Sequence, residues 1–575
     1  MSPAFSRSLI FAFLMPLCAL AATPSLELTG AEGSLRDNIH AYLGISGQDC
    51  EATSWRLASY ANQADTEIRD AGRALGYYQL TSQMQIEQTD DCWVMQVEVT
   101  PGPRVTYVSV TAQLEGEGKT NAAMQRALAS NPMVEGGYFH HGQYESFKSA
   151  LLQQASVQGF FDASFVSAQA LVSQQDNSAR VSLVLDTGPR YRIGDISISH
   201  DILSRSLIDR YVNLESGQAY RSGDLVDLKS EFQASQYFSS VAVEPQLDEL
   251  ADGKVPINID LQSGAKHHYL VGAGYSSDTG ARVRLGYENR YINDAGHHLN
   301  LNVNASEVIT TYQVDYSIPM WRPAYQTLRL YTGFSQEDIN QSVSNRLASG
   351  VNYSSWNNSD WFNHYGLSVE EEEFYFGDGP ITTSELIIPM FSTTYTTTTD
   401  SVKYPRRGWS VFVRLKGASE STGSSTNFAQ AFGRFKFILP AGEGRLLFRL
   451  DGGITEVDDF SKLPISQRFF AGGDASIRGY DYKNVGPLND DDIVIGGSRL
   501  LTGSIEYDRK VYGDVVLAAF VDEGSAFNGS YVESYRGVGM GVRWLSPVGP
   551  VRADIAKALD GHKGWRLHLS VGPDL

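Results

Sequence analysis

One arginine offers the most specific chemistry in this sequence. Arg478 stands in the run 468–480, where an aromatic pair and a double glycine precede Ser-Ile-Arg-Gly-Tyr. Two adjacent glycines let a backbone turn sharply or approach another segment closely. Because a guanidinium rarely lies inside a protein without a carboxylate, we expect an acidic partner for Arg478. The alternative is an exposed turn with an incidental arginine.

The residue patterns of common enzymes are missing from the sequence. It has no Gly-x-Ser-x-Gly elbow of serine hydrolases and no Gly-x-x-x-x-Gly-Lys-Ser/Thr phosphate loop. Three adjacent histidine pairs begin at His140, His267 and His297. Neighbours on a strand point to opposite faces, so such a pair is not a metal site by itself. We therefore expect no enzyme activity, no metal and no cofactor.

Composition narrows the class of protein. The 575 residues carry a net charge of −20, and only 19% of them are charged. Binding to nucleic acid requires a basic surface, so that class of partner is not expected. The 54 glycines, 30 tyrosines and 26 phenylalanines favour a large β-structure.

The first 21 residues are typical of a secretory signal peptide. Arg7 supplies the positive charge, Leu9 to Leu20 form an apolar run, and Ala19-Leu20-Ala21 fits the cleavage rule. The run has about 12 residues, whereas a membrane helix needs ~20. A lipoprotein signal ending at Cys18 is the alternative, although Leu17 is large for the position before such a cysteine.

Two cysteines remain after the signal peptide. Cys50 and Cys92 are expected to form a disulfide, because exported chains meet an oxidising compartment. Two buried free thiols are the alternative.

The first half contains a repeated unit. Val97–Tyr107 recurs as Leu183–Ile193, each a strand, a Gly-Pro break and a second strand. A Gly-aromatic marker runs in step at Gly76 and Gly159, and Gln236-Tyr237-Phe238 matches it more weakly. The period of about 80 residues predicts three copies of one α+β domain in the order β-α-α-β-β. In the first copy, one helical face is formed by Ala61, Ala64, Ile68, Ala71 and Leu75.

The second half, from about Lys266, alternates between apolar and polar residues. Leu299, Leu301 and Val303 alternate with asparagines. This period of two predicts an antiparallel β-barrel with lipid outside and water inside. About 310 residues at ~19 per strand and connection allow about sixteen strands. A soluble β-sandwich would alternate in the same way, but it would not explain the length and the signal peptide.

Several motifs together resemble the BamA/TamA-type outer-membrane assembly superfamily. The Arg478-Gly479-Tyr480 run resembles its inward-folded loop signature, and Phe520–Gly524 resembles its Phe-x-Asp-x-Gly strand. Asp400–Gly408 resembles a turn leading into a strand of the barrel. His562, Gly564, Leu567 and Leu569 resemble a C-terminal β-signal. The resemblance implies that Asp522, Glu506 or both hold Arg478 inside the barrel. Such a clamp would be structural.

The resemblance also implies a domain layout and partners. The three repeats resemble POTRA domains, and their number is most similar to the TamA-type branch. The predicted parts are a signal peptide (1–21), POTRA domains (22–103, 104–189 and 190–265) and an outer-membrane barrel (266–575). The barrel would lie in the outer-membrane lipid and the POTRA domains in the periplasm. The implied partners are unfolded outer-membrane clients such as autotransporters and a TamB-like inner-membrane-anchored protein at the first POTRA domain.

A mechanism follows from barrel closure. The first strand, about His268 to Tyr275, must meet the last, about Trp565 to Val571, and glycines weaken such pairing. We expect a lateral seam formed by Leu270, Gly272, Gly274, Gly564, Leu567 and Leu569, with Leu270 close enough to Leu569 for a cross-link. A client strand could pair there and leave into the lipid. A two-partner-type secretion pore and a passive receptor or adhesin are the alternative functions.

Overall fold

The computed structural model describes residues 23–45, 49–89, 92–357, 360–398, 403–530, 533–547, 549–560 and 564–571. The predicted signal peptide lies outside the described residues. The chain divides into two compact units, which we describe separately. One contains Met1–Ile196, Glu215–Leu225 and Pro245–Ile257, and the other contains Ser197–Leu214, Val226–Glu244 and Asn258–Leu575. None of the described helices combines the length and the apolar character needed to cross a membrane.

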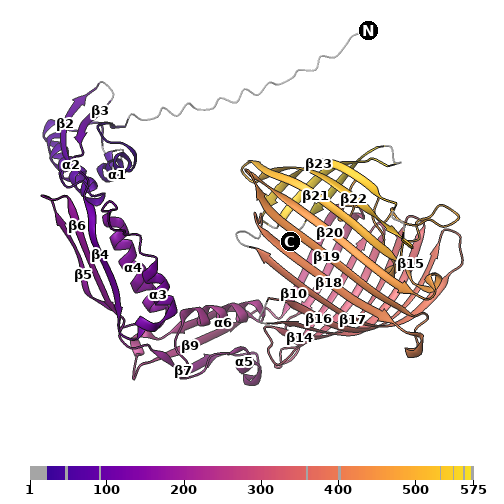
Figure 1. Ribbon diagram of the computed structural model, residues 1–575. Coiled ribbons are helices and arrows are strands. Elements are labelled where there is room, and N and C mark those ends of the chain that lie inside the picture. The colour runs from indigo at the N-terminus through magenta and orange to yellow at the C-terminus, as the bar shows by residue number, and fades with distance from the viewer. Residues whose placement is uncertain are drawn as a thin grey trace, which may run out of the picture. The chain divides into compact units, whose positions relative to one another are not determined.

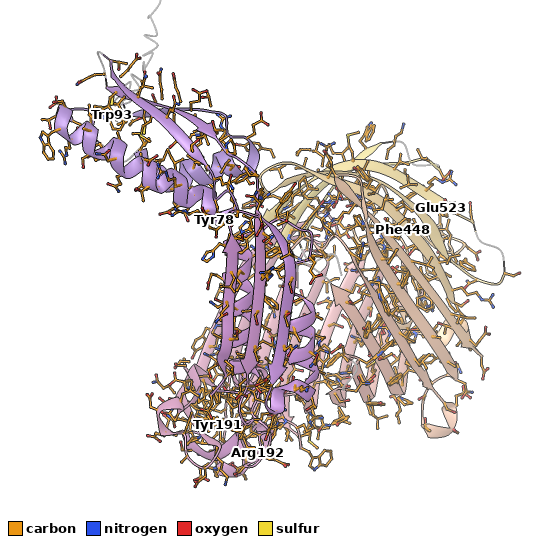
Figure 2. The ribbon with its side chains drawn as sticks, turned by 60° about the vertical axis from the view of Figure 1, so that its left-hand side comes forward. Tyr78, Trp93, Tyr191, Arg192, Phe448 and Glu523 are labelled. Carbon is orange, nitrogen blue, oxygen red and sulfur yellow. A yellow bond between two sulfur atoms is a disulfide. The ribbon has the colours of Figure 1, made fainter. Side chains whose placement is uncertain are left out.

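The first module has a three-stranded sheet covered by two helices (Figure 1). Its elements are β1 (Ser25–Thr29), α1 (Gly33–Leu43), α2 (Ser54–Ala74), β2 (Thr81–Gln88) and β3 (Trp93–Thr100). The sheet order is β1-β3-β2, with β1 parallel to β3. Ala64, Ile68 and Ala71 of the predicted helix face are buried, together with Trp93, which Figure 2 labels.

Two further modules repeat this order. The second has the sheet β4-β6-β5 and the third has β7-β9-β8, whose residues are shared between the two units. Their elements are β4 (Thr106–Glu115), α3 (Ala122–Ala129), α4 (His141–Val157), β5 (Ser164–Ser173), β6 (Ser178–Asp186), β7 (Arg192–Ser199), α5 (Arg205–Tyr211), α6 (Ser222–Ala234), β8 (Phe238–Pro245) and β9 (Lys254–Ser263). The predicted three α+β domains are confirmed.

The repeated Gly-aromatic marker has a backbone cause. Gly76, Gly159 and Gln236 follow the second helix of their modules with φ of +92°, +83° and +62°. A helix commonly ends on a residue in the left-handed region, where glycine is least strained. The aromatic residues that follow pack into the module cores, with Phe160 and Tyr237 fully buried.

Sixteen consecutive antiparallel strands form the barrel (Figure 1). They are β10 (His267–Ser276), β11 (Gly280–Asn289), β12 (His298–Ser306), β13 (Ile309–Pro319), β14 (Gln326–Ile339), β15 (Ser342–Trp356), β16 (Phe362–Phe376), β17 (Thr382–Thr398), β18 (Gly408–Ala418), β19 (Phe428–Ala441), β20 (Gly444–Val457), β21 (Arg499–Tyr512), β22 (Val515–Phe527), β23 (Tyr535–Ser546), β24 (Gly549–Ala558) and β25 (Trp565–Val571). The predicted barrel of about sixteen strands is confirmed.

The barrel wall is apolar outside and polar inside. Leu330, Leu450 and Leu517 are exposed on its strands, whereas Asp451 and Asp554 are buried. This inverted distribution is typical of a barrel in lipid, because the outer surface needs no water.

The segment 458–498 joins β20 to β21 and carries the Arg478 motif; we call it the motif loop. Ala471, Ile477, Tyr480 and Val485 of this loop form a buried cluster with Ala558 of β24. The loop therefore folds against the inner face of the wall.

Candidate functional site: an arginine clamp and an open seam

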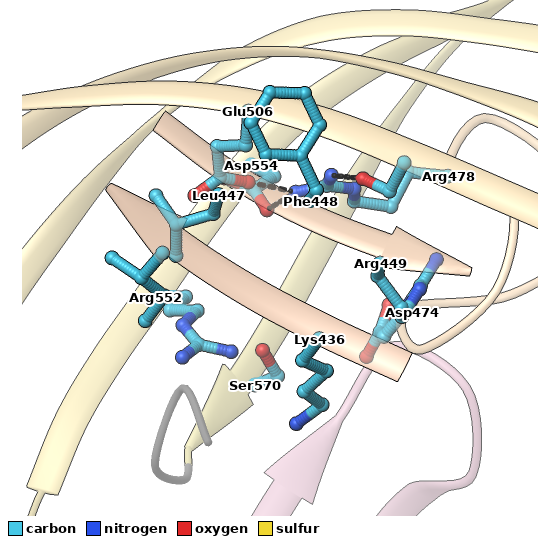
Figure 3. Close-up of a pocket in the computed structure, with 12 residues that line it drawn as sticks. Lys436, Leu447, Phe448, Arg449, Asp474, Arg478, Glu506, Arg552, Asp554 and Ser570 are labelled. Atoms are coloured by element: carbon cyan, nitrogen blue, oxygen red, sulfur yellow. Dashed lines mark hydrogen bonds and ion pairs between the residues drawn. The ribbon is translucent and has the colours of Figure 1, made fainter. Parts of the chain in front are cut away.

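Arg478 lies at the centre of a buried ion cluster. Its Nε and Nη2 donate to the two carboxylate oxygens of Asp522, at 2.7 and 2.9 Å. Its Nη1 donates to Glu506 Oε2 at 2.8 Å and to Asp554 Oδ2 at 3.0 Å (Figure 3). The planar guanidinium thus binds one carboxylate in a bidentate fashion and still serves two others. The clamp ties the motif loop to β21, β22 and β24.

A second arginine balances the remaining acids. Arg543 of β23 donates to Glu506 Oε1 at 3.0 Å and contacts both oxygens of Asp554. Three carboxylates therefore face two guanidinium groups. The ring of Phe520 also lies against Arg478, with the ring centroid 3.3 Å from Cζ of the arginine. Ion pairs in such a buried position hold only when most of their hydrogen-bonding groups are satisfied.

Gly479 and Tyr480 seat the loop beside Arg478. Gly479 has φ of +100°, and a Cβ at this position would lie 2.8 Å from the backbone N of Ala558. Only glycine permits this approach of loop to wall. Its N–H donates to His568 Nε2 of β25 at 2.8 Å. The buried Tyr480 donates its hydroxyl to the carbonyl of Arg536 or Asp560, each 3.3 Å away.

The two end strands of the sheet meet without forming a ladder. β10 and β25 lie side by side, yet they are the two ends of the strand order, and no backbone pairing joins them within the described ranges. In the described part of the chain, a hydrogen bond between their neighbourhoods runs from Leu569 N–H to Ser277 Oγ, at 3.0 Å. Ser277 lies in the turn that follows β10.

This contact corrects the predicted register of the seam. Leu270 lies seven positions before Ser277, about 20 Å away at ~3.3 Å per residue. It therefore does not face Leu569, and the predicted cross-link between them is wrong. In an antiparallel arrangement Val571 lies about level with Tyr275. Gly564 and Leu567 then lie beyond the turn, and not opposite Gly272 and Gly274.

Most of β10 is consequently an open edge. His267–Gly274 have no strand of the described chain on the seam side, and Tyr269 and Val271 are 72% and 77% exposed. The strand contains neither proline nor a charged Lys, Arg, Asp or Glu residue, which are the usual means of blocking an edge. Such an edge can accept another strand.

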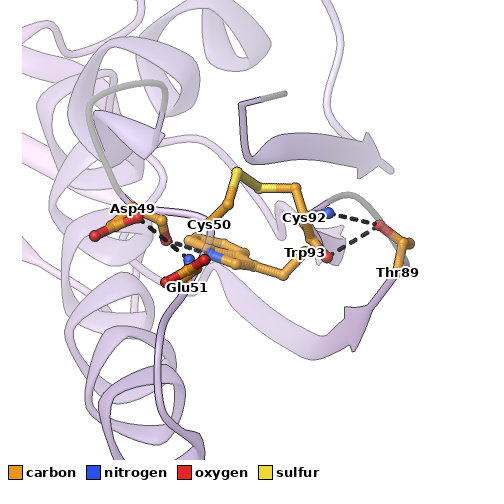
Figure 4. Close-up of a disulfide and its surroundings, with 6 residues drawn as sticks. All are labelled: Asp49, Cys50, Glu51, Thr89, Cys92 and Trp93. Atoms are coloured by element: carbon orange, nitrogen blue, oxygen red, sulfur yellow. Dashed lines mark hydrogen bonds between the residues drawn. A yellow bond between two sulfur atoms is a disulfide. The ribbon is translucent and has the colours of Figure 1, made fainter. Parts of the chain in front are cut away.

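Other predicted positions fall in different parts of the chain. Cys50 and Cys92 are joined in a disulfide beside Trp93, whose indole N–H donates to Asp49 O at 3.0 Å (Figure 4). Asp400 and His562 lie outside the described residues. At the rest of the predicted turn, Tyr404 donates to Asp508 at 2.9 Å.

Sequence reasoning missed three polar groups. Asp554 completes the Arg478 cluster, and its only signal is its place on the inward face of β24. Arg445 binds Asp508 through Nε and Nη2, both at 2.8 Å, forming a second buried clamp. Asp278, Asp474 and His568 offer atoms of metal-ligand type that lie within 4.8 Å of one another. No sequence motif marks this trio.

The third module contacts the barrel through a tyrosine of the second unit. Burial raises the pKa of Tyr237 well above its ordinary value, so the hydroxyl stays protonated. It donates to Gly296 O at 2.6 Å and accepts from His298 Nε2 at 2.9 Å. Arg210 adds a bond to Met320 O at 2.8 Å.

Three small α+β modules are followed by a sixteen-stranded antiparallel barrel with an inner loop clamped to its wall. The Omp85 superfamily domain matches residues 263–573, which is more than half of the chain. The chain belongs to the Omp85 superfamily, as the sequence motifs predicted. POTRA domain 1 of TamA matches residues 25–101.

Known relatives are similar over part of their length. The outer membrane protein assembly factor BamA of Nitratidesulfovibrio vulgaris is 23% identical over 392 residues, covering 63% of this chain and 48% of that protein. Outer envelope protein 80 of Arabidopsis thaliana is 26% identical over 369 residues, covering 56% and 47%. The chain thus spans about half the length of these two relatives.

A solved structure shares the fold. BamA from Haemophilus ducreyi lacking POTRA domains 1–3 aligns with a TM-score of 0.63 and 16% identity, over 81% of this chain and 98% of that one. This similarity supports the architecture of modules and barrel.

Proposed function

We propose that this protein is an outer-membrane protein assembly factor that inserts or translocates client β-barrel proteins, autotransporters among them. The barrel lies in the outer membrane of a Gram-negative cell, and the POTRA domains extend into the periplasm. Relatives named as outer membrane protein assembly factors support this function. The open edge of β10 is the observation that carries it.

The mechanism uses the seam between β10 and β25. A client's terminal strand adds to β10 along His267–Gly274, where no described strand competes for the backbone groups. Strand addition supplies main-chain hydrogen bonds without requiring one client sequence. The client then leaves sideways into lipid through the seam. Leu270, Gly272 and Gly274 form the accepting edge, while Gly564, Leu567 and Leu569 belong to the last strand, which is bonded to the turn after β10.

The Arg478 clamp keeps this seam functional by fixing the inner loop. Arg478, Gly479 and Tyr480 hold the motif loop against β21 to β24, so the lumen stays filled while the edge is used.

The POTRA domains provide the partner surface. In the first POTRA domain, β2 is an edge strand of its sheet, and edge strands accept extended segments. We propose that a TamB-like, inner-membrane-anchored protein docks on this domain and that unfolded clients pass along the modules.

The test is the outer-membrane proteome after depletion of this protein. Restoring the wild-type chain should return autotransporters or other barrels that vanish on depletion, whereas Arg478→Ala should not. Arg509→Ala, which removes an exposed arginine whose partner Glu443 has a 72% exposed side chain, is the matched control and should restore them. An unchanged proteome with one secreted protein trapped in the periplasm would instead identify an export pore.

A further inference from the structure

The last strand is tied to the motif loop more firmly than to the first strand. His568 of β25 is 2% exposed and lies between two groups of that loop. Its Nε2 accepts the N–H of Gly479 at 2.8 Å, and its Nδ1 lies 2.5 Å from Asp474 Oδ1. Arg566 of β25 also pairs with Asp481 of the loop.

These contacts define the protonation of His568. An imidazole nitrogen that accepts a backbone N–H carries no proton, so the proton of a neutral ring must be on Nδ1. Nδ1–H then donates to Asp474. Both ring nitrogens are therefore hydrogen-bonded, and the ring connects Gly479 to Asp474 within the motif loop.

Asp474 continues the connection to the first strand. It accepts the hydroxyl of Ser277 at 2.9 Å, and its own N–H donates to Asp278 Oδ2 at 2.9 Å. Ser277 and Asp278 form the turn after β10. Ser277 also accepts the N–H of Leu569, which closes the circuit back to β25.

We infer that His568 is a positioning residue that fastens the last strand to the first through Asp474. The polar latch formed by Ser277, Asp278, Asp474 and His568 takes the place of the missing ladder. For its consequence in the cell, this inference rests on the proposed function.

The latch suits a seam that must open and close again. Its few side-chain bonds can be exchanged for bonds to water at little net difference in free energy. A continuous ladder would require several backbone pairs to separate together. Because His568 binds Gly479, next to Arg478, the position of the motif loop also decides whether β25 is held. The clamp and the latch are thereby coupled through two adjacent residues.

Hydrogen exchange of the purified full-length protein in lipid nanodiscs tests the latch without any client. Asp474→Ala removes the bonds to His568 and Ser277, so amides of residues 565–571 should exchange on the order of tenfold faster. Asp474→Asn keeps an acceptor oxygen for both donors and should stay within about twofold of wild type. Strands β14 to β17 should not change in either variant.

Two histidine variants separate the two bonds of the ring. His568→Gln can still accept from Gly479 but cannot reproduce the bond to Asp474, whereas His568→Asn can reach Asp474 only. Each should give intermediate exchange in residues 565–571. His364→Gln is the matched control, since His364 also bonds a neighbouring strand, through Ser354 Oγ at 2.9 Å, and lies away from the seam. Heat-modifiable migration on a gel establishes that each variant is folded.

Equal exchange in wild type and Asp474→Ala would overturn the latch. The latch would also be overturned if Asp474→Asn lost as much protection as Asp474→Ala. The asparagine keeps the acceptor oxygen and loses only the negative charge, so that result would indicate a cation site. Faster exchange of wild type after chelation of divalent cations would lead to the same conclusion. None of these outcomes depends on client assembly, so the latch and the proposed function can fail independently.

Discussion

Replacing Arg478 by alanine removes the centre of the buried cluster and leaves its acids behind. Asp522 loses the bonds of 2.7 and 2.9 Å to Nε and Nη2, and its side chain is 0% exposed. Ser504 Oγ, at 2.6 Å, and the backbone N–H of residue 478, at 3.0 Å, remain its donors. Glu506 and Asp554 each keep an arginine partner, because Arg543 still binds both. The penalty therefore falls mainly on one stranded carboxylate.

Stranding one partner of a buried pair costs about 3–5 kcal/mol, which we expect for Arg478→Ala. Asp522→Asn should cost less, about 2 kcal/mol, because Arg478 keeps Glu506 and Asp554. The double variant should lose about as much as Arg478→Ala alone, since the asparagine no longer carries a charge to bury. The two substitutions should therefore be non-additive by about 2 kcal/mol.

Urea unfolding of the barrel, refolded in lipid vesicles and followed by tryptophan fluorescence, measures these differences. Arg478→Lys should lie between wild type and Arg478→Ala, because an ammonium keeps the charge and loses the bidentate geometry. Arg509→Ala, at an exposed position, is again the control. An Arg478→Ala variant within about 1 kcal/mol of wild type would refute the clamp, and so would strict additivity with Asp522→Asn.

Three further predictions concern single contacts. Gly479→Ala adds a Cβ 2.8 Å from Ala558 N at positive φ. The urea midpoint of the barrel should therefore fall by the equivalent of about 1–3 kcal/mol. Gly442→Ala, also at positive φ but with open space around it, should change the midpoint less. Tyr237→Phe leaves Gly296 O without its donor and should cost about 1–3 kcal/mol in the same assay; an unchanged midpoint would argue that water replaces the hydroxyl. Replacing Cys50 and Cys92 together by serine opens a link across 42 positions and should destabilise the first module by ~4 kcal/mol in urea; a loss below about 1 kcal/mol would contradict the chain-entropy estimate.

The parts of the fold that follow from local rules could be predicted from the sequence. The helix face through Ala64 and Ile68 is a periodicity, and the marker at Gly76 and Gly159 reflects a φ that glycine adopts easily. Alternation along the strands likewise needs only neighbouring residues. Each feature is visible within a few positions of the chain.

The parts that depend on register between distant strands could not be predicted. Asp554 joins the Arg478 cluster because β24 brings it level with Glu506 and Asp522, and nothing in its own neighbourhood of sequence marks it. The predicted register of the seam was wrong for the same reason. Leu569 contacts Ser277, which lies beyond the end of β10, and not Leu270 within that strand. His568 is a single histidine in an amphipathic strand, and its role depends on where the motif loop folds.

Assembly of clients by a seam-locked protein tests the central claim most directly. Ser277→Cys with Leu569→Cys places two thiols at neighbouring positions across the seam, where Ser277 Oγ lies 3.0 Å from Leu569 N. In depleted cells, client barrels should fail to assemble while this pair is oxidised and should recover after reduction. Each single cysteine variant and the wild-type chain, treated identically, should show no difference in client assembly between oxidising and reducing conditions. Normal assembly by the oxidised pair would contradict lateral opening at the seam.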